Sequence, residues 1–192
     1  AYWQEFQKEK IVYPETTVLG NCFVYEASQM YLDKTCFMMV GKNLKYLSAN
    51  LQSQLFQYYL RGMIRIVGKN TLQYSKQFID EAFILEIEKA KQKPFEILVD
   101  FILLLKPNKE LEYMSIFFER VIDVAVYELY FADTLHKEGF GVLEILESEL
   151  KDTTIDIKTI EQIYKTWSQK EHKIAYNVHY IAVLDVVKTI EG

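Results

Sequence analysis

An interval of cationic and amide side chains without any carboxylate is the strongest chemical feature of this sequence. No Asp or Glu occurs between Asp33 and Asp80. Lys and Arg can neutralise phosphates, and the amides of Asn and Gln can pair with base edges. The positive residues of the interval are Lys34, Lys42, Lys45, Arg61, Arg65, Lys69 and Lys76. The interval therefore predicts a surface that faces a polyanion, with a solvated basic face as the simpler alternative.

The residue types divide this interval into two expected roles in binding nucleic acid. Arg can donate two hydrogen bonds to guanine and Asn or Gln can pair with adenine, whereas Lys is a point charge suited to phosphate. The expected base-reading residues are Arg61, Arg65, Asn70 and Gln73. The expected phosphate contacts are Lys42, Lys45, Lys69, Lys76 and Tyr74. For Tyr74, packing in the core is an equally good interpretation.

The side chains that catalysis requires are poorly supplied. The sequence contains no phosphate-binding loop of the G-x-x-x-x-G-K-[ST] type, no G-x-G-x-x-G and no G-x-S-x-G. His172 and His179 are seven residues apart on an expected helix, which is too few ligands, too widely spaced, for zinc. Asp156 and Lys158 form a fragment of a nuclease-like D-x-K arrangement, but without a partner acid we interpret Asp156 as a helix cap. We expect no catalytic residue, no metal site and no enzymatic activity of this chain alone.

The charge of the whole chain conceals the local basic excess. The chain has 192 residues, with 22 Lys+Arg and 27 Asp+Glu, so its formal net charge is −5. Half of the residues are hydrophobic, which excludes disordered and low-complexity classes. Residues 1–93 carry 12 basic and 9 acidic side chains, whereas residues 94–192 carry 10 and 18. The acidic surplus thus belongs to the second half.

No targeting or membrane segment is recognisable. The most apolar stretch, residues 97–105, is interrupted by Asp100 and is far shorter than the roughly 18 to 20 residues that span a bilayer. The first ten residues are polar and charged, unlike a signal peptide. Cys22 and Cys36 are expected to be buried free thiols of a reducing compartment. We therefore expect a cytoplasmic protein without membrane contact.

The first half of the chain predicts mixed α and β structure. The expected elements are strands at 10–14, 22–26, 31–40 and 64–67 and a helix over 43–62, which Asn43 can cap. Apolar residues recur in this helix at intervals of three and four, ending at Leu55 and Tyr58, and predict one buried stripe. Gly68, Lys69 and Asn70 are typical turn residues.

The second half predicts a helical domain. Pro94 suits the first position of a helix, and the polar residues 89–93 before it are typical of a linker. The expected helices are 95–106, 110–130, 142–150, 157–167 and 171–190. The fold class is therefore α+β, with a small mixed α/β domain at 1–88 followed by an all-helical domain at 89–192.

Several segments, taken in order, resemble one family of DNA-modifying enzymes. Tyr2–Glu15 (YWQEFQKEKIVYPE), the strands that end at Val40, and Asn43–Tyr59 (NLKYLSANLQSQLFQYY) are similar to the start of its target-recognition domain. In the last of these segments, Gln52 stands where the family usually has Asn. Phe117–Phe131 (FFERVIDVAVYELYF) resembles the run that follows this domain. The family is the type IIG restriction-modification enzymes, with a TaqI-like specificity domain at the C-terminal end of an adenine-specific DNA methyltransferase.

The resemblance implies that this chain selects the DNA sequence on which other domains act. It implies a C-terminal piece of a longer polypeptide, which the absence of an initial Met also favours. The absent part would carry a methyltransferase domain, with or without a nuclease domain. S-adenosylmethionine and Mg would be cofactors of that parent enzyme, and none is expected for this fragment. The implied partners are double-stranded DNA, whose target adenine would be flipped out, and the catalytic domains of the same polypeptide.

A helical protein-interaction scaffold is the alternative function. In that hypothesis the acidic second half docks other domains, and the basic interval is solvent-exposed surface without DNA contact. Salt dependence distinguishes the two hypotheses, because the affinity of a protein for duplex DNA falls steeply with salt.

Overall fold

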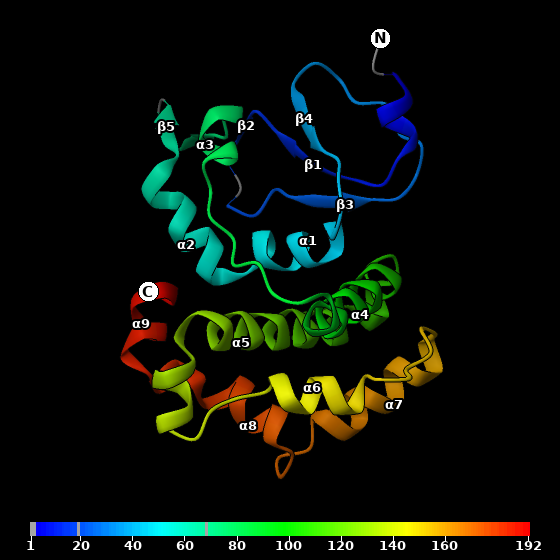
Figure 1. The fold of residues 1–192 in the computed structure, drawn as a ribbon, viewed down its shortest axis with the longest axis vertical. Coiled ribbons are helices and arrows are strands. Elements are labelled where there is room, and N and C mark those ends of the chain that lie inside the picture. The colour runs from blue at the N-terminus through cyan, green and yellow to red at the C-terminus, as the bar shows by residue number, and fades with distance from the viewer. Residues whose placement is uncertain (1–2, 19, 68) are drawn as a thin grey trace. The chain divides into compact units, whose positions relative to one another are not determined.

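The computed structural model describes residues 3–18, 20–67 and 69–192. The protein is α+β, as predicted, with short antiparallel strands in the N-terminal part and helices throughout the remainder (Figure 1). The chain divides into two compact units. Unit 1 comprises Ala1–Gln52 and Phe56–Ile84, and unit 2 comprises Ser53–Leu55 and Leu85–Gly192. The boundary predicted between 88 and 89 lies four residues beyond the division at 84, and the short segment at 53–55 was not anticipated.

The first sheet of unit 1 is built around a central strand. Its strands are β1 (Lys10–Pro14), β3 (Val24–Glu26) and β4 (Cys36–Met39), in the order β3-β1-β4. Both outer strands pair antiparallel with β1, and Ile11 lies opposite Tyr25 on one side and Met39 on the other. Residues opposite one another share a face of the sheet, and the burial of Ile11 and Tyr25 shows that this face meets the core.

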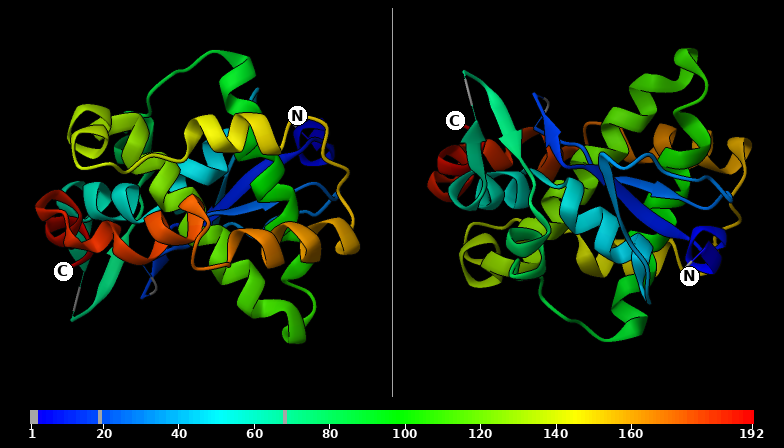
Figure 2. Two further views of the ribbon diagram at one scale, coloured as in Figure 1. Left: turned by 90° about the horizontal axis from the view of Figure 1, so that it is seen from below. Right: turned by 90° about the horizontal axis from the view of Figure 1, so that it is seen from above.

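The second sheet of unit 1 is smaller and contains a β-hairpin. Its strands are β2 (Thr16–Thr17), β5 (Arg65–Val67) and β6 (Thr71–Gln73), in the order β2-β6-β5. The strand predicted at 64–67 is confirmed as β5. The predicted turn connects β5 to β6, and its first residue, Gly68, lies outside the described residues. Figure 2 shows the teal and green strands of this hairpin projecting from the rest of unit 1.

Two helices, rather than the single helix predicted over 43–62, follow β4. They are α1 (Leu44–Gln52) and α2 (Gln54–Met63). The interruption at Ser53 changes the helical phase, so Phe56 and Leu60 are the buried apolar residues of α2, beside the buried amide of Gln57. Tyr58, expected in the apolar stripe, is instead 45% exposed.

One hydrophobic cluster holds the elements of unit 1 together. The short helices η1 (Trp3–Gln7) and α3 (Lys76–Asp80) complete this unit. Near the centre of the cluster, the ring of Phe23 lies 5.3 Å from that of Tyr13 and meets Tyr74 edge-on at 5.7 Å. Cys22 and Cys36 are free, half-buried thiols, and burial raises the pKa of Cys22 to about 11.

Helices make up most of unit 2. They are α4 (Lys89–Leu105), α5 (Glu112–Lys137), α6 (Leu143–Glu149), α7 (Ile157–Trp167), α8 (Lys173–Tyr180) and α9 (Asp185–Glu191), with short turns η2 (Lys109–Leu111) and η3 (Ile181–Val183). The predicted cap of α7 is confirmed, because the carboxylate of Asp156 accepts hydrogen bonds from the amide and the hydroxyl of Thr159 at 3.0 and 2.9 Å.

Two helix predictions in unit 2 are wrong. Pro94 does not start a helix but lies inside α4, where its missing N–H forfeits the hydrogen bond to the carbonyl of Ala90. That single loss is compatible with a helix of 17 residues. The helix expected over 171–190 is interrupted at Leu184, a buried residue whose extended backbone (φ −72°, ψ 133°) separates η3 from α9.

Aromatic side chains from α4, α5 and α7 meet in the core of unit 2, among a larger number of aliphatic residues. The ring of Phe118 meets Phe101 at 5.3 Å and Trp167 at 6.1 Å, both in edge-on arrangements. All three residues are almost completely buried. In the part of the chain that the structure describes, no helix has both the length and the apolar composition needed to cross a membrane.

Candidate nucleic-acid interface

The hairpin of unit 1 places two of the expected base-reading residues directly opposite each other. Arg65 in β5 is paired with Gln73 in β6, and Gln73 is paired on its other side with Thr16 in β2. Directly opposed residues of an antiparallel pair extend their side chains from the same face. Arg65, Gln73 and Thr16 therefore form one polar row across the sheet, which we call the Arg65 row.

The Arg65 row lies on the face of the sheet that is turned away from the core. The neighbour of Gln73 in β6, Leu72, packs against the hydrophobic cluster of unit 1. Because side chains alternate along a strand, Gln73 extends from the opposite face. Arg65 and Thr16 are exposed, and Gln73 is half-buried. A guanidinium and an amide on adjacent strands can thus reach the same ligand from solvent.

Arg61 lies on the element that leads into the hairpin. It belongs to the last turn of α2 and is exposed. A Cβ atom on Gly20 would lie 3.8 Å from Nη2 of Arg61, which places the guanidinium beside the loop that follows β2. Three residues, Gly62, Met63 and Ile64, separate Arg61 from β5, so Arg61 and Arg65 occupy adjoining elements.

The turn of the hairpin carries two more of the predicted residues. Lys69 and Asn70 are both exposed and directly precede β6. Their position at the end of a projecting hairpin is compatible with contact to a ligand that the strands approach.

The structure does not bring Lys42 and Lys45 to the hairpin. Figure 1 shows β4 leading into α1 on one side of unit 1 and α2 leading into β5 on the other. The two lysines lie at the N-terminal end of α1, and the ammonium group of Lys45 is 5.8 Å from the centre of the Tyr25 ring. The interval that lacks acids in sequence is therefore divided in space into two separate cationic groups.

Lys76 is exposed but is paired with a carboxylate. Its ammonium group forms an ion pair with Asp80, one turn further along α3. Such exposed pairs are weak, so the ammonium group remains able to exchange its partner for a phosphate.

Tyr74 is a core residue, so its expected phosphate contact is wrong. Its side chain is 1% exposed, and its hydroxyl donates a hydrogen bond of 2.6 Å to the carbonyl of Gly20. Burial raises the pKa of this hydroxyl. The physical reason is alternation along β6: Gln73 faces outward, and the next residue turns inward to meet Phe23.

Thr16 is the residue of the Arg65 row that sequence reasoning missed. It belongs to a strand of two residues, paired with a strand 57 positions later in the chain. So short a segment has no periodicity from which a strand could be predicted. The opposition of Arg65 and Gln73, by contrast, could have been found by folding the chain about the predicted turn.

The two histidines that are too few and too widely spaced in sequence for zinc lie at opposite ends of α8. His172 precedes α8 as its N-cap, and its Nδ1 accepts a hydrogen bond from the amide of Ile174 at 3.2 Å. His179 lies in the last turn of the same helix. Among the described residues, no three His, Cys, Asp or Glu side chains are grouped as a metal site requires.

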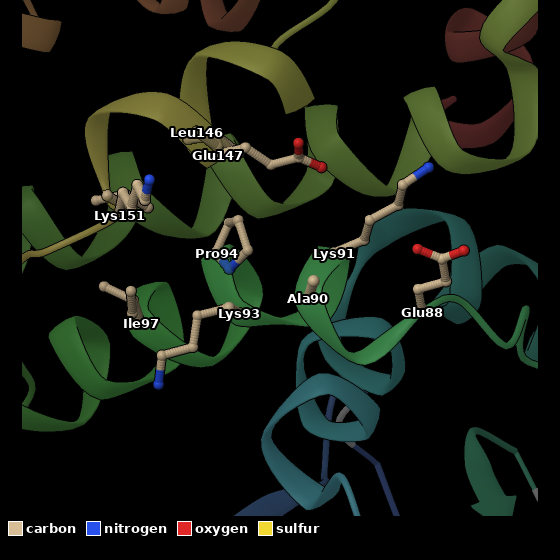
Figure 3. Close-up of a pocket in the computed structure, with 10 residues that line it drawn as sticks. Glu88, Ala90, Lys91, Lys93, Pro94, Ile97, Leu146, Glu147 and Lys151 are labelled. Carbon is tan, nitrogen blue, oxygen red and sulfur yellow. The ribbon is translucent and has the colours of Figure 1, made fainter.

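Unit 2 has an open groove of about 320 Å³ between α4 and α6 (Figure 3). Its apolar surface comes from Pro94, Ile97, Leu146 and Leu150. Cations and carboxylates are mixed around it, namely Lys91, Lys93, Lys151, Glu88 and Glu147. The residues that line it include no histidine, cysteine or hydroxyl group. The groove therefore has no evident nucleophile and no single sign of charge.

A second cavity in unit 2, of about 250 Å³, is lined by the buried carboxylate of Glu128, and both oxygens of this carboxylate are hydrogen-bonded to the protein. One oxygen of Glu128 accepts hydrogen bonds from the amides of Val142 and Leu143 at 2.5 and 2.9 Å. The other oxygen lies 2.8 Å from Nε2 of His136. With its acceptor sites engaged in this way, Glu128 fixes the chain at the start of α6.

Comparisons of this chain with models of protein families, with curated proteins and with solved structures find no match.

Proposed function

We propose that this chain is a DNA-recognition module that reads the target sequence for a restriction-modification adenine methyltransferase or endonuclease. The catalytic domains, the S-adenosylmethionine and the Mg belong in this proposal to the rest of the polypeptide. Such an enzyme would act in the cytoplasm. The sequence resemblance to type IIG specificity domains supports the choice of parent enzyme. The single observation that carries the DNA contact is the Arg65 row.

The chemistry of the Arg65 row suits the major groove of DNA. A guanidinium can donate to both acceptors of guanine, and an amide can pair with both groups of adenine. Beyond β2 the β5–β6 hairpin has two strands, and a two-stranded β-ribbon is narrow enough to enter a groove about 12 Å wide. Arg65 and Gln73 lie opposite each other on one outward face, so they are suited to contact neighbouring bases at once.

The remaining cations are suited to contact phosphates. Lys69 lies at the turn and Lys76 follows β6 by three residues, so both can meet the backbone on either side of a groove. Lys42 and Lys45, at the other end of the two helices, would contact a separate stretch of backbone. Such contacts position the module without reading sequence.

A protein-interaction scaffold is the second candidate, and exposed apolar side chains favour it. Leu104 of α4 and Tyr113 and Ile116 of α5 are 41%, 54% and 55% exposed. Exposed apolar side chains that form a continuous patch are typical of surfaces that dock another domain. In this alternative the catalytic domains of the same polypeptide would be the partner, and DNA would not be bound.

Salt titration of duplex binding tests the proposed function. The full chain is titrated with a labelled duplex of random sequence, by fluorescence anisotropy, between about 50 and 200 mM salt. We expect the logarithm of the association constant to fall linearly with the logarithm of the salt concentration. Lys69→Gln should reduce the slope by about 1, whereas Lys165→Gln, an equal loss of charge on the exposed surface of α7, should not change it. Absence of duplex binding, or binding indifferent to salt, would contradict the proposal.

A second experiment tests sequence reading separately from charge. Duplexes are selected from a random pool by the full chain and by Arg65→Lys, which keeps the charge but loses the two-pronged donor. We expect the variant to lose the preference for guanine at one position while its salt slope stays the same. An unchanged preference would exclude Arg65 as a base-reading residue.

A further inference from the structure

The end of the β5–β6 hairpin carries a pair of residues with side-chain methyl groups beyond the Arg65 row. Val67 in β5 is paired with Thr71 in β6. Val67 is two residues from Arg65, and Thr71 is two residues from Gln73, so both pairs extend from the same outward face. Val67 is 43% exposed and Thr71 is half-buried. Two methyl-bearing side chains thus stand next to a guanidinium and an amide.

The sheet narrows between the two pairs. β2 is paired with Leu72 and Gln73 but not with Thr71, so the Arg65 row crosses three strands and the Val67–Thr71 pair crosses only two. The part of the sheet that carries Val67 and Thr71 is therefore the slender end of the ribbon, which a groove admits most readily. Lys69, in the turn, is the cationic residue next to this end of the hairpin. Residues 34–79, which include the whole hairpin, contain no Asp or Glu.

The distance between the two pairs matches the spacing of bases. Two residues along an antiparallel strand span about 6.8 Å, and stacked base pairs are about 3.4 Å apart. A ribbon aligned with the groove would therefore place Val67 and Thr71 about two base-pair steps from the base that Arg65 reads. In the major groove the apolar group available at base edges is the 5-methyl group of thymine.

We propose that Val67 and Thr71 contact the 5-methyl group of a thymine two base pairs from the position read by Arg65 and Gln73. This inference rests on the proposed function, since it specifies what the same surface recognises. It identifies the target as one that combines a hydrogen-bonded position with a thymine at a fixed separation. Desolvation of the methyl group against two apolar side chains supplies the discrimination.

Thymine-to-uracil substitution tests the proposal, because uracil lacks only the methyl group. Duplexes selected by the full chain are synthesised with uracil at each thymine in turn, and their affinities are measured by anisotropy. We expect one substitution, two base pairs from the position affected by Arg65→Lys, to weaken binding about fourfold, the effect of returning one methyl group to water. Val67→Ser should lose most of the thymine preference, and Val67→Ser combined with Thr71→Ser should bind the thymine and uracil duplexes equally.

Two further variants keep the result unambiguous. Thr71→Ser removes a single methyl group and should reduce the thymine preference without disturbing the fold. Ile66→Ser is the matched control, since Ile66 is 63% exposed but extends from the opposite face, and it should keep the full preference.

The outcomes separate this inference from the proposed function. Salt-dependent duplex binding without any effect of uracil, or an effect that stays complete when Val67 and Thr71 are both replaced by Ser, overturns the methyl contact and leaves DNA recognition standing. A chain that binds no duplex overturns both.

Discussion

The buried carboxylate of Asp123 accepts a hydrogen bond of 2.8 Å from the backbone amide of Gln54, the first residue of α2. The first amides of a helix lack partners within the helix, so Asp123 satisfies one of them from a distant part of the chain. Asp123 also contacts Arg120 at 3.2 Å, and Arg120 in turn binds Glu191 at 2.8 Å. An acidic residue of α5 therefore holds both the start of α2 and, through Arg120, the last turn of α9.

The protonation of Asp123 predicts a pH-dependent stability. Burial raises the pKa of Asp123 to about 7, and the Gln54 amide and the charge of Arg120 oppose this shift only partly. Because the folded-state pKa lies above the ordinary value of about 3.9, its contribution to stability is complete below about pH 4 and is lost as the pH rises to about 7. Between pH 5 and 8 the free energy of unfolding should fall by about 2 kcal/mol more in the wild type than in Asp123→Asn. Urea denaturation of both proteins at pH 5 and pH 8 measures this difference in unfolding free energy.

Asp152→Asn is the matched control for the pH experiment, because Asp152 is exposed in the turn after α6. It should follow the wild type at both pH values. Equal pH dependence in the wild type and in Asp123→Asn would show that Asp123 is ionised throughout this range.

The occupied carboxylate of Glu128 predicts a structural rather than a chemical role. Glu128→Gln keeps a hydrogen-bond acceptor but loses the charge that three donors share, so we expect a loss of about 2 kcal/mol in unfolding free energy. Gly141→Ala should destabilise by about 1 to 3 kcal/mol, because its φ of 152° is strained for other residues and a Cβ would lie 3.1 Å from Oε1 of Glu128. Thermal denaturation checks both. Unchanged stability of Glu128→Gln would count against the assigned role.

The burial of Tyr74 predicts a phenotype opposite to that of a DNA contact. Tyr74→Phe leaves the carbonyl of Gly20 without its donor and should reduce the unfolding free energy by about 1 kcal/mol. The salt slope of duplex binding, measured on the folded variant, should stay the same. A reduced slope with unchanged stability would restore the phosphate contact expected from sequence.

Arg61 and Arg65 predict base-specific losses. If the proposed parent enzyme carries this chain, replacing either with Ala in it should cost roughly 1 to 3 kcal/mol at one base pair and alter the sites that it modifies. Lys45→Ala should instead weaken binding evenly across sequences. Methylome sequencing of cells that express each variant distinguishes these patterns. If both arginine variants keep the site preference of the wild type, neither arginine is a base-reading residue.

The parts of the fold that could be predicted are those with local causes. β1 is a β-branched run that ends at Pro14, and α7 begins where Asp156 can cap it. The break at Ser53 could not be predicted in this way. Apolar spacing continues through it, and the carboxylate that caps the new helix comes from Asp123, 69 residues later.

The candidate site was predictable to the same extent. Arg65 and Gln73 lie symmetrically about a turn rich in Gly and Asn, so their opposition follows from local sequence. The separation of Lys42 and Lys45 from them depends on the path of two helices. The inward position of Tyr74 depends on its contacts with Phe23 and Gly20, which lie more than 50 residues away.

The assignment of residues 53–55 to unit 2, inside a stretch otherwise assigned to unit 1, limits how the two units could be separated by recombination. A recombination crossover at residue 84 would transfer Gln54 without Asp123, whose carboxylate accepts the hydrogen bond from the Gln54 amide. A transplanted segment of residues 1–84 would then begin α2 with an amide that has lost its acceptor, and the segment left behind would keep a buried carboxylate that has lost its donor. Successful swaps should therefore carry both units together or inherit an acid at the position of Asp123.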